Sequence, residues 1–348
     1  MEKSRNKQHL TYLDFLNIGA CFCVIWMHCN GLVHTFSNTR AWKESLVVET
    51  IAYWAVPVFF MISGATLMGY REKYTTNIYF KKRILKTVIP FLAWSVLNMF
   101  YKGWRGELDL SQLNLKVFID MLINTKFEGV YWFFIPLFAV YLSIPVLSLL
   151  RKNRKILLYM VSMSIMTISI LPTACVLMGI TYNGLFQFPL VGGYVIFVIL
   201  GYLLSTADFK RRELCVIYIL GIIGILVRFV STYIGSIESG ELNQTFWGYM
   251  NFPSVFLAMA VFVAFRYIPW EKMLDKIKVS LKCVQTISSA GFGIYLIHMM
   301  VIRQTLEWFN LDKTHLYWRT GGAVFVYIVS LLIVLALKRI PYIKYIVP

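Results

Sequence analysis

Three polar side chains interrupt the first apolar segment of this 348-residue chain, residues 13–33: Asp14, Asn17 and His28. Ionisable groups are costly inside a bilayer and usually mark a functional site. At 100° per residue, the three fall within about a 60° sector of one helix face, and His28 lies ~21 Å beyond Asp14. Imidazole has an unperturbed pKa of about 6.5, so His28 is suited to take the proton of a hydroxyl group as a general base. The alternative is a hydrogen-bonded packing histidine.

Further polar or aromatic residues are candidates for a substrate pathway. In the segment 286–306, Tyr295 and His298 are three residues apart and therefore share a helix face. The other candidates for the pathway or the acceptor site are Ser63, Trp132 and Asn251. For residues 131–134, Tyr-Trp-Phe-Phe, an aromatic belt at the membrane surface is the alternative, and Arg228, Arg303 and Arg319 are expected to snorkel to that surface.

A basic cluster precedes the third apolar segment. It contains Lys81, Lys82, Arg83 and Lys86, four positive charges in six residues. Guanidinium and ammonium groups bind phosphates, so the cluster is a candidate site for a phosphorylated soluble donor. The alternative is that these charges only fix the topology of the chain.

The elements that must position these residues are membrane-spanning helices. Hydrophobic residues make up 58% of the chain and the mean hydropathy is +0.65, well above the values of soluble domains. Ten apolar segments of suitable length predict an all-α bundle of about ten transmembrane helices in a single domain, residues 1–348. The segments are 13–33, 48–68, 84–101, 131–150, 156–178, 188–204, 214–234, 253–268, 286–306 and 318–337.

The positive charge is distributed very unevenly between the two sides of this topology. The formal net charge is +17, and 22 Lys and Arg residues fall on the side of the termini against 7 on the other side. Positive residues favour cytoplasmic loops, so both termini are predicted to be cytoplasmic, including Lys3, Arg5 and Lys7. This distribution argues for a membrane protein and against a nucleic-acid-binding one.

Motif searches add little to this. The six cysteines form neither a C-x-x-C pair nor a disulfide framework, and no metal site is predicted. The chain has no P-loop, no G-x-S-x-G, no H-E-x-x-H and no Rossmann fingerprint. The residues alone therefore indicate a ten-span protein with an intramembrane histidine site, which fits either an enzyme or a transporter of a small polar solute.

Four segments, in order, resemble the bacterial acyltransferase 3 family. Asp14-Phe-Leu-Asn17 through Trp26-Met27-His28 resembles its first-span signature, and Phe80-Lys81-Lys82-Arg83 leading to Pro90 resembles its basic second loop and third span. Residues 131–145 resemble its fourth span, and Gly293-Ile-Tyr-Leu-Ile-His298 its penultimate span. One departure is Asn17, where many members carry arginine.

This resemblance implies a multi-pass enzyme of the bacterial cell membrane. Its reaction would be O-acyl transfer, mainly of acetyl, from cytoplasmic acyl-CoA to a hydroxyl of a surface polysaccharide, exopolysaccharide or glycolipid. His28 matches the family's essential histidine, and Lys81, Lys82 and Arg83 match its donor-side basic loop. Acyl-CoA would be a co-substrate, with no tightly bound cofactor.

Overall fold

The computed structural model describes the backbone of residues 2–348 and the side chains of residues 11–348. Lys3, Arg5 and Lys7 therefore lie outside the described side chains. Residues 2–348 contain fifteen α-helices and no strand. The helices are α1 (Glu2–Cys29), α2 (Arg40–Ala52), α3 (Ala55–Leu67), α4 (Thr76–Arg83), α5 (Ile89–Trp104), α6 (Leu115–Ile123), α7 (Phe134–Leu150), α8 (Arg154–Ile165), α9 (Leu171–Leu177), α10 (Val195–Thr206), α11 (Arg211–Ser239), α12 (Phe252–Tyr267), α13 (Trp270–Ile277), α14 (Leu281–Trp308) and α15 (Ala323–Leu337).

The predicted all-α membrane bundle is confirmed. Eight helical stretches are long and apolar enough to cross a bilayer, and the pair α12 and α13, bent by 60°, makes a ninth if it is counted as one span. The remaining predicted segment, 188–204, overlaps the short apolar helix α10 of 12 residues. The ten predicted segments thus all overlap helices, while the number of spans stays a prediction.

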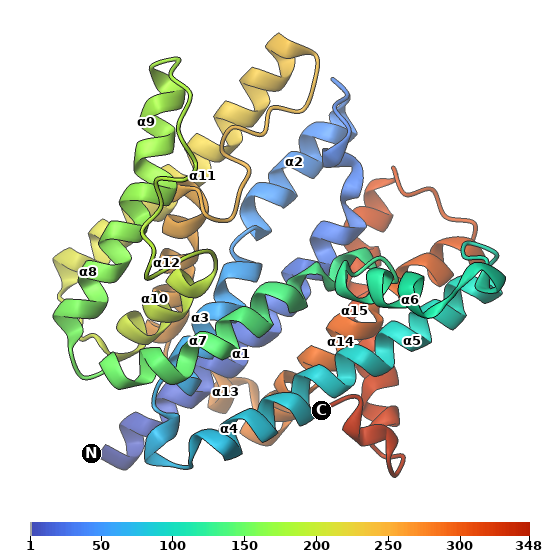
Figure 1. Cartoon of the computed structure of the whole chain (residues 1–348), viewed down its shortest axis with the longest axis horizontal. Helices are drawn as coiled ribbons and strands as arrows, with labels where there is room; N and C mark the ends of the chain where they lie inside the picture. Colours follow the sequence, from blue (N-terminus) through green and yellow to red (C-terminus); the bar gives the residue numbers. More distant parts are fainter. Residues whose placement is uncertain (1) are drawn as a thin grey trace.

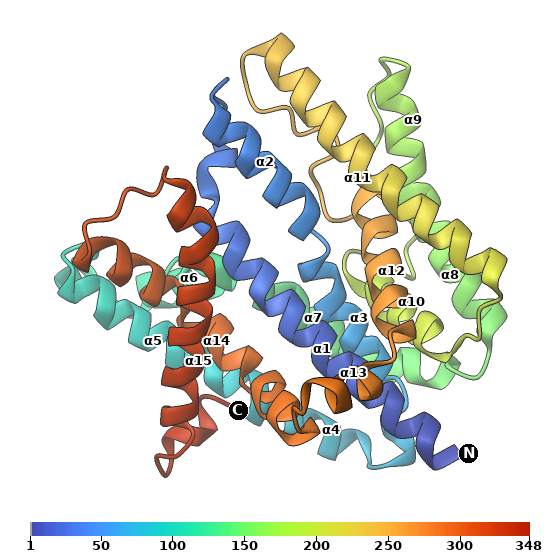
Figure 2. The same ribbon diagram turned by 180° about the vertical axis from the view of Figure 1, so that it is seen from behind.

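Helix α1 runs through the middle of the bundle. It packs against α2, α3, α12, α13, α14 and α15. Figures 1 and 2 show it crossing diagonally, with α8 to α12 on one side and α4 to α6, α14 and α15 on the other. Residues on several faces of α1 are buried, including Leu16, Ala20 and Ile25. Side chains on α1 are thereby held by contacts with helices from both halves of the chain.

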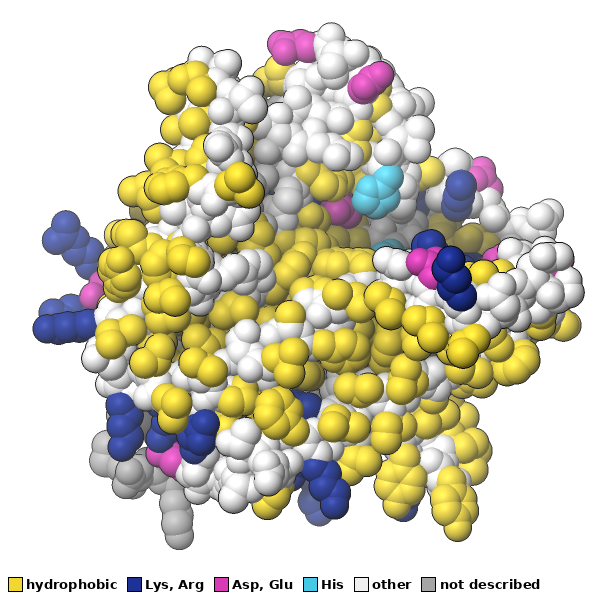
Figure 3. All heavy atoms as spheres, in the orientation of Figure 1, with side chains coloured by type: hydrophobic (Ala, Val, Ile, Leu, Met, Phe, Trp, Pro, Cys, Tyr) yellow, Lys and Arg dark blue, Asp and Glu magenta, His cyan; other side chains and the backbone are white. Residues whose placement is uncertain are grey.

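Charge is separated along the bundle. Both chain ends lie at the same end of the molecule, close to α4 and α13 (Figure 1). Figure 3 shows Lys and Arg side chains gathered along the lower left and the lower edge, an apolar band above them, and Asp and Glu side chains at the top. The arrangement agrees with the predicted accumulation of positive charge at one side of the membrane, and the cytoplasmic location of that side stays a prediction.

The long segment between α5 and α7 contains a short amphipathic α-helix. Residues 110–124 have apolar side chains at helical spacing, and α6 occupies Leu115–Ile123. Leu115 and Ile123 are exposed, and none of its residues is buried. An amphipathic helix of this kind lies with its apolar side in the boundary between lipid and water.

Glycine residues bring α3 and α10 into close contact. A Cβ at Gly64 would lie 1.9 Å from the carbonyl oxygen of Val198, and one at Gly201 would lie 2.0 Å from the carbonyl oxygen of Met61. Small residues allow membrane helices to approach backbone to backbone. The pair therefore fixes α3, and through it the position of α2 and the outer end of α1.

We expect Gly64→Ala to lower the stability of the protein by about 1–3 kcal/mol, because the added methyl group has no space against Val198. The measurement is the thermal unfolding midpoint of purified protein in detergent. Gly321→Ala is the control, since a Cβ at Gly321 meets nothing within 4 Å. Equal unfolding midpoints for the two variants would contradict the close packing of α3 and α10.

Candidate active site

His28 lies near the end of α1 and borders two cavities. The first, of about 320 Å³, is lined by aromatic side chains together with His34 and Glu49, and we call it the Glu49 cavity. The second, of about 610 Å³, is lined by hydroxyl groups of Thr35, Ser37, Thr39 and Thr314 and by Lys313. Figure 3 shows histidine side chains in a hollow in the upper half of the molecule. A group bound in either cavity can therefore reach the His28 imidazole.

A second imidazole faces His28 from α14. The ring centroids of His28 and His298 are 5.2 Å apart, and His298 is fully buried. Nδ1 of His298 lies 2.6 Å from the carbonyl oxygen of Tyr295. Because a carbonyl only accepts hydrogen bonds, Nδ1 carries the proton and Nε2 keeps its lone pair. Nε2 is buried without a hydrogen-bond partner among the described residues, so it remains available to a donor in the site.

The aromatic run 131–134 lies inside the bundle near the histidine pair and does not form an aromatic belt at the membrane surface. Tyr131, Phe133 and Phe134 are buried, and only Trp132 is 36% exposed. The Tyr131 hydroxyl donates to the Leu296 carbonyl at 2.8 Å and accepts from the Asn98 amide at 3.0 Å. The belt interpretation is therefore wrong, because hydrogen bonds to α14 hold the run inside the bundle.

Tyr295 and Trp132 both line the Glu49 cavity, as expected of pathway residues. The Tyr295 hydroxyl donates to the carbonyl of Val130, and its ring centroid lies 5.5 Å from that of His298. Tyr295 thus connects the start of the aromatic run with the histidine pair.

Buried ion pairs surround the site where the sequence suggested snorkelling arginines. Arg228 and Arg319 are 1% and 3% exposed, so the expectation of snorkelling is wrong for both. Arg319 pairs with Glu44 at 2.6 Å, and Arg228 lies 4.0 Å from Glu49. A carboxylate partner inside the protein removes the reason for the side chain to reach the interface.

Arg303, the third arginine, forms a two-pronged pair with Glu128. Its Nη1 and Nη2 donate to the two carboxylate oxygens at 2.6 and 3.0 Å. Glu128 is 2% exposed, while the Arg303 side chain is 24% exposed. Bidentate geometry holds two side chains rigidly. The pair joins Glu128, three residues before the aromatic run, to α14 at a position five residues after His298.

Asp14 and Asn17 face the same neighbour as His28, α14, but lie near the other end of the apolar stretch Thr11–Cys29 of α1. The Asn17 amide donates to the Ser288 carbonyl at 2.8 Å and lies 3.2 Å from its hydroxyl, and Asp14 also bonds to Ser288. The predicted shared face of α1 is thus the face that packs on α14. Eleven residues separate Asn17 from His28, a rise of ~17 Å, so the structure does not bring these two residues into contact.

The basic cluster lies near the chain termini. Lys82 Nζ sits 3.9 Å above the Tyr74 ring, and the Arg83 guanidinium lies 5.4 Å from the Tyr141 ring centroid. Lys338, at the end of α15, donates to the Ser289 carbonyl at 2.7 Å. Burial, together with the nearby charge of Lys86, lowers the pKa of Lys338. Lys338, with Lys86 nearby, therefore lies next to Ser289, the neighbour in sequence of the Asn17 partner Ser288.

Three predicted pathway residues line neither cavity: His298, which is buried behind His28, and Ser63 and Asn251. The Ser63 hydroxyl donates to the Phe59 carbonyl within α3 at 3.1 Å, next to the tight contact at Gly64. The Asn251 amide donates to the Thr245 carbonyl at 3.1 Å in the loop before α12. Neither residue lines the cavities at His28.

Several residues that line the Glu49 cavity were not predicted from the sequence. Glu49 was inside the second predicted span, where an acid is as unusual as the residues that were selected. Tyr53, Trp247 and Tyr249 had no distinguishing pattern, because the loop before α12 is brought over the cavity only by the fold. His34, at the end of the turn Gly31–His34, also lines it, and partial burial lowers its pKa.

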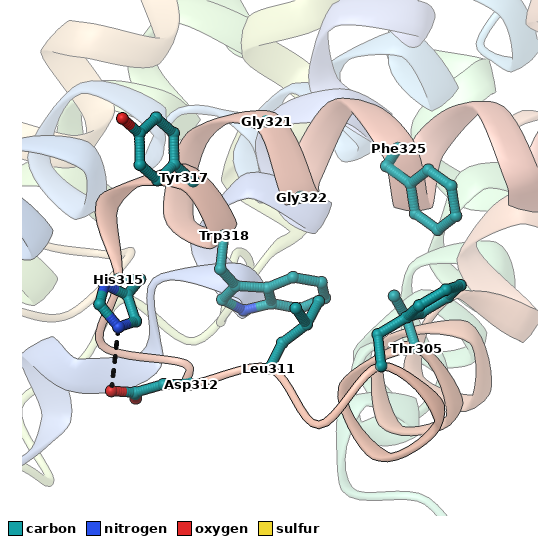
Figure 4. A pocket seen from close by; sticks show the side chains of 10 residues that line it. Thr305, Leu311, Asp312, His315, Tyr317, Trp318, Gly321, Gly322 and Phe325 are labelled. Carbon is teal, nitrogen blue, oxygen red and sulfur yellow. Dashed lines mark ion pairs between the residues drawn. The ribbon is translucent and has the colours of Figure 1, made fainter.

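A separate hollow of about 600 Å³ lies between the end of α14 and the start of α15 (Figure 4). Its lining is mostly apolar, including Phe309, Trp318 and Phe325, and an ion pair of 3.7 Å between His315 and Asp312 stands at its edge. His28 does not line this hollow. In the part of the chain with described side chains, no three His, Cys, Asp or Glu residues are grouped so that they could hold a metal ion.

The fold and site define a multi-pass α-helical membrane protein with an intramembrane histidine pair, of which His28 borders two cavities. A family model described as an acyltransferase domain matches residues 10–339, nearly the whole chain. The protein therefore belongs to the acyltransferase 3 family and is an acyltransferase that moves groups other than amino-acyl groups. No curated protein and no solved structure matches this chain.

We expect Glu128→Leu to destabilise the protein by about 3–5 kcal/mol, because Arg303 then loses its bidentate partner inside the bundle. The double variant Glu128→Leu/Arg303→Met should regain a large part of this loss, since no buried charge is left unpaired. Thermal unfolding of the two single variants and the double variant in detergent measures the coupling. A double variant as unstable as the sum of the single variants would show that the pair contributes no coupling.

Proposed function

We propose that this protein is a membrane O-acyltransferase that moves an acyl group, acetyl in the first instance, from cytoplasmic acyl-CoA to a carbohydrate hydroxyl. The observation that carries the proposal is His28, an imidazole within a membrane-spanning helix that borders two cavities and faces the free Nε2 of His298. The family membership supports acyl transfer in general. Donor, acceptor and base are our assignments.

In this mechanism His28 acts as the general base. Its neutral imidazole takes the proton of the acceptor hydroxyl while the oxygen attacks the thioester carbonyl. The tetrahedral intermediate collapses with cleavage of the carbon–sulfur bond, and the imidazolium returns the proton to the departing coenzyme A sulfur. His298 Nε2 makes no hydrogen bond to the described residues; we assign it the role of accepting one from the second nitrogen of His28 in the substrate complex, which orients the base. The products are the acyl ester and free coenzyme A.

The donor approaches from the basic end of the bundle. Lys81, Lys82, Arg83 and Lys86 attract its phosphates, and Lys338 lies beside Lys86. The acyl-bearing arm then follows the α1–α14 face, along which Asp14 and Asn17 meet Ser288. Asn17 contributes an amide where many relatives carry a charged arginine, so in this chain it contacts the arm through hydrogen bonds alone. The acyl-bearing arm must therefore span the ~17 Å between Asn17 and His28.

The acceptor enters from the opposite side. Aromatic side chains and the Glu49 carboxyl line the cavity next to His28, a combination that suits the apolar faces and hydroxyl groups of sugars. A surface polysaccharide, an exopolysaccharide or a glycolipid in a bacterial cell membrane would present such a sugar. The rival function, export of a small polar solute without covalent chemistry, uses the same cavities and leaves the solute unmodified.

We expect His28→Ala to reduce acyl transfer by about 10²–10⁴-fold, the usual contribution of a general base. The assay follows radiolabelled acetyl groups from acetyl-CoA to glycan in membranes containing the full-length protein. The matched control is His315→Ala, because His315 is an exposed histidine in the loop before α15. Label that reaches glycan equally well with His28→Ala would eliminate His28 as the base. Unmodified solute transported by the wild type, without label transfer, would favour the exporter.

We expect Lys81→Gln/Lys82→Gln to raise the KM for acetyl-CoA several-fold with little change in kcat, because the two ammonium groups attract the donor but do not touch the reacting atoms. The effect should shrink at high ionic strength, where surface charges are screened. Lys152→Gln/Lys155→Gln is the control, since it removes two charges from the loop before α8 and from the first turn of that helix. Equal changes of KM in the two double variants would reduce the basic cluster to a topology determinant.

A further inference from the structure

Glu49 is an acidic residue in α2 whose side chain is only 5% exposed and yet lines a cavity. Its nearest charged partner is Arg228, at 4.0 Å from Nη2 to Oε1, which is longer than a hydrogen bond. A buried carboxyl group needs hydrogen-bond donors. The Glu49 cavity is where a ligand can supply them.

Arg228 is fixed behind the cavity wall. Its Nη1 donates to the carbonyls of Trp247 and Phe246 at 2.8 and 3.1 Å. Its guanidinium carbon lies 3.3 Å from the Tyr53 ring centroid and 4.6 Å from that of Trp247. Arg228 does not itself line the cavity. It therefore holds Glu49 and the aromatic wall in place without offering its charge to a ligand.

One wall of the Glu49 cavity is a stack of aromatic rings. Tyr53 and Tyr249 stack at 4.1 Å with planes 9° apart, and Trp132 continues the stack at 5.9 Å from Tyr249. Stacked rings lose little conformational entropy when they bind, because they are already ordered. Trp132, at 36% exposure, is the most accessible of the three.

We propose that the Glu49 cavity binds one neutral pyranose unit of the acceptor. The C–H face of the sugar packs on the aromatic wall, ring hydroxyls donate to the Glu49 carboxyl, and a remaining hydroxyl is directed toward His28. The volume of about 320 Å³ lies at the small end of ligand sites and suits a single ring. Glu49 is a positioning residue in this arrangement, since it touches the sugar but not the bond that is formed.

The charge of the lining selects the class of sugar. Among the described residues that line the cavity, Glu49 is the only acid, and no Lys or Arg is present. The lowered pKa of His34 keeps its imidazole neutral at physiological pH. A uronic acid or a phosphorylated sugar would meet Glu49 without a cationic partner. The cavity therefore discriminates in favour of neutral hexoses and N-acetylhexosamines.

The test is a binding titration that needs no acyl transfer. Full-length protein in nanodiscs is titrated with the methyl glycosides of glucose, galactose, N-acetylglucosamine and glucuronic acid, and tryptophan fluorescence is recorded, since Trp132 and Trp247 line the cavity. We expect saturable binding of at least one neutral glycoside and at least about tenfold weaker binding of the glucuronide. Glu49→Gln should weaken the neutral glycoside about tenfold, whereas Glu238→Gln, in the last turn of α11, should not.

The outcomes separate this inference from the proposed function on which its His28 step rests. No binding of any neutral glycoside, or equal binding of neutral and acidic ones, would overturn the pyranose site even if acyl transfer occurs. Saturable, Glu49-dependent sugar binding without label transfer would leave the site standing and reject the transferase mechanism. Trp132→Leu alters an exposed ring and breaks no ion pair, and it should also weaken binding. It therefore tests the site independently if Glu49→Gln fails to fold. Unchanged binding in a folded Glu49→Gln or Trp132→Leu variant would likewise contradict the site.

Discussion

The packing of α1 against α14 is the contact on which the rest of the structure depends. It joins polar groups along most of the membrane thickness, with the Asn17–Ser288 hydrogen bond at one end and the pair of His28 and His298 toward the other. Between them the Cys21 thiol lies 3.6 Å from the carbonyl of Gly291. Small side chains on α14 permit this approach, because polar groups in a bilayer must find partners within the protein. A site that spans both membrane halves follows from this one interface.

Irregular backbone geometry near the His28 end of α1 also supplies hydrogen-bond partners for polar groups inside the bundle. In the π-helical turn Trp318–Gly322, the Arg319 carbonyl accepts hydrogen bonds from the Trp26 indole at 3.0 Å and from the Asn30 amide at 2.7 Å. A π turn disturbs the usual hydrogen-bond ladder and so leaves a carbonyl for another helix. The last turn of α1, which carries His28, is fixed to α15 in this way.

The buried ion pairs carry a desolvation penalty, and their positions suggest what they contribute in return. Glu49, paired with Arg228, lines the Glu49 cavity, while Glu128–Arg303 joins the segment before the aromatic run to α14. Pairs of this kind add little stability compared with apolar packing, but they restrict the arrangement of the helices that they join. Here they hold α14 and α2, the two elements that place His298 and the Glu49 carboxyl around the same imidazole. The pairs therefore help to fix the positions of these two side chains relative to His28.

The sequence by itself determined the all-α membrane class, the positions of the apolar helices and the polar face of α1, because hydrophobic length and helical period are local properties. It also singled out His28, Trp132 and Tyr295, which line the Glu49 cavity, and His298, which faces His28. Only the tertiary structure decided that Tyr131 is buried, that Arg228 and Arg319 pair with acids, and that Ser63 and Asn251 lie away from the cavities. It alone assembled Glu49, Tyr53 and Tyr249 around His28. Those residues lie on separate segments of the chain, and their proximity comes from helix packing, which no local pattern encodes.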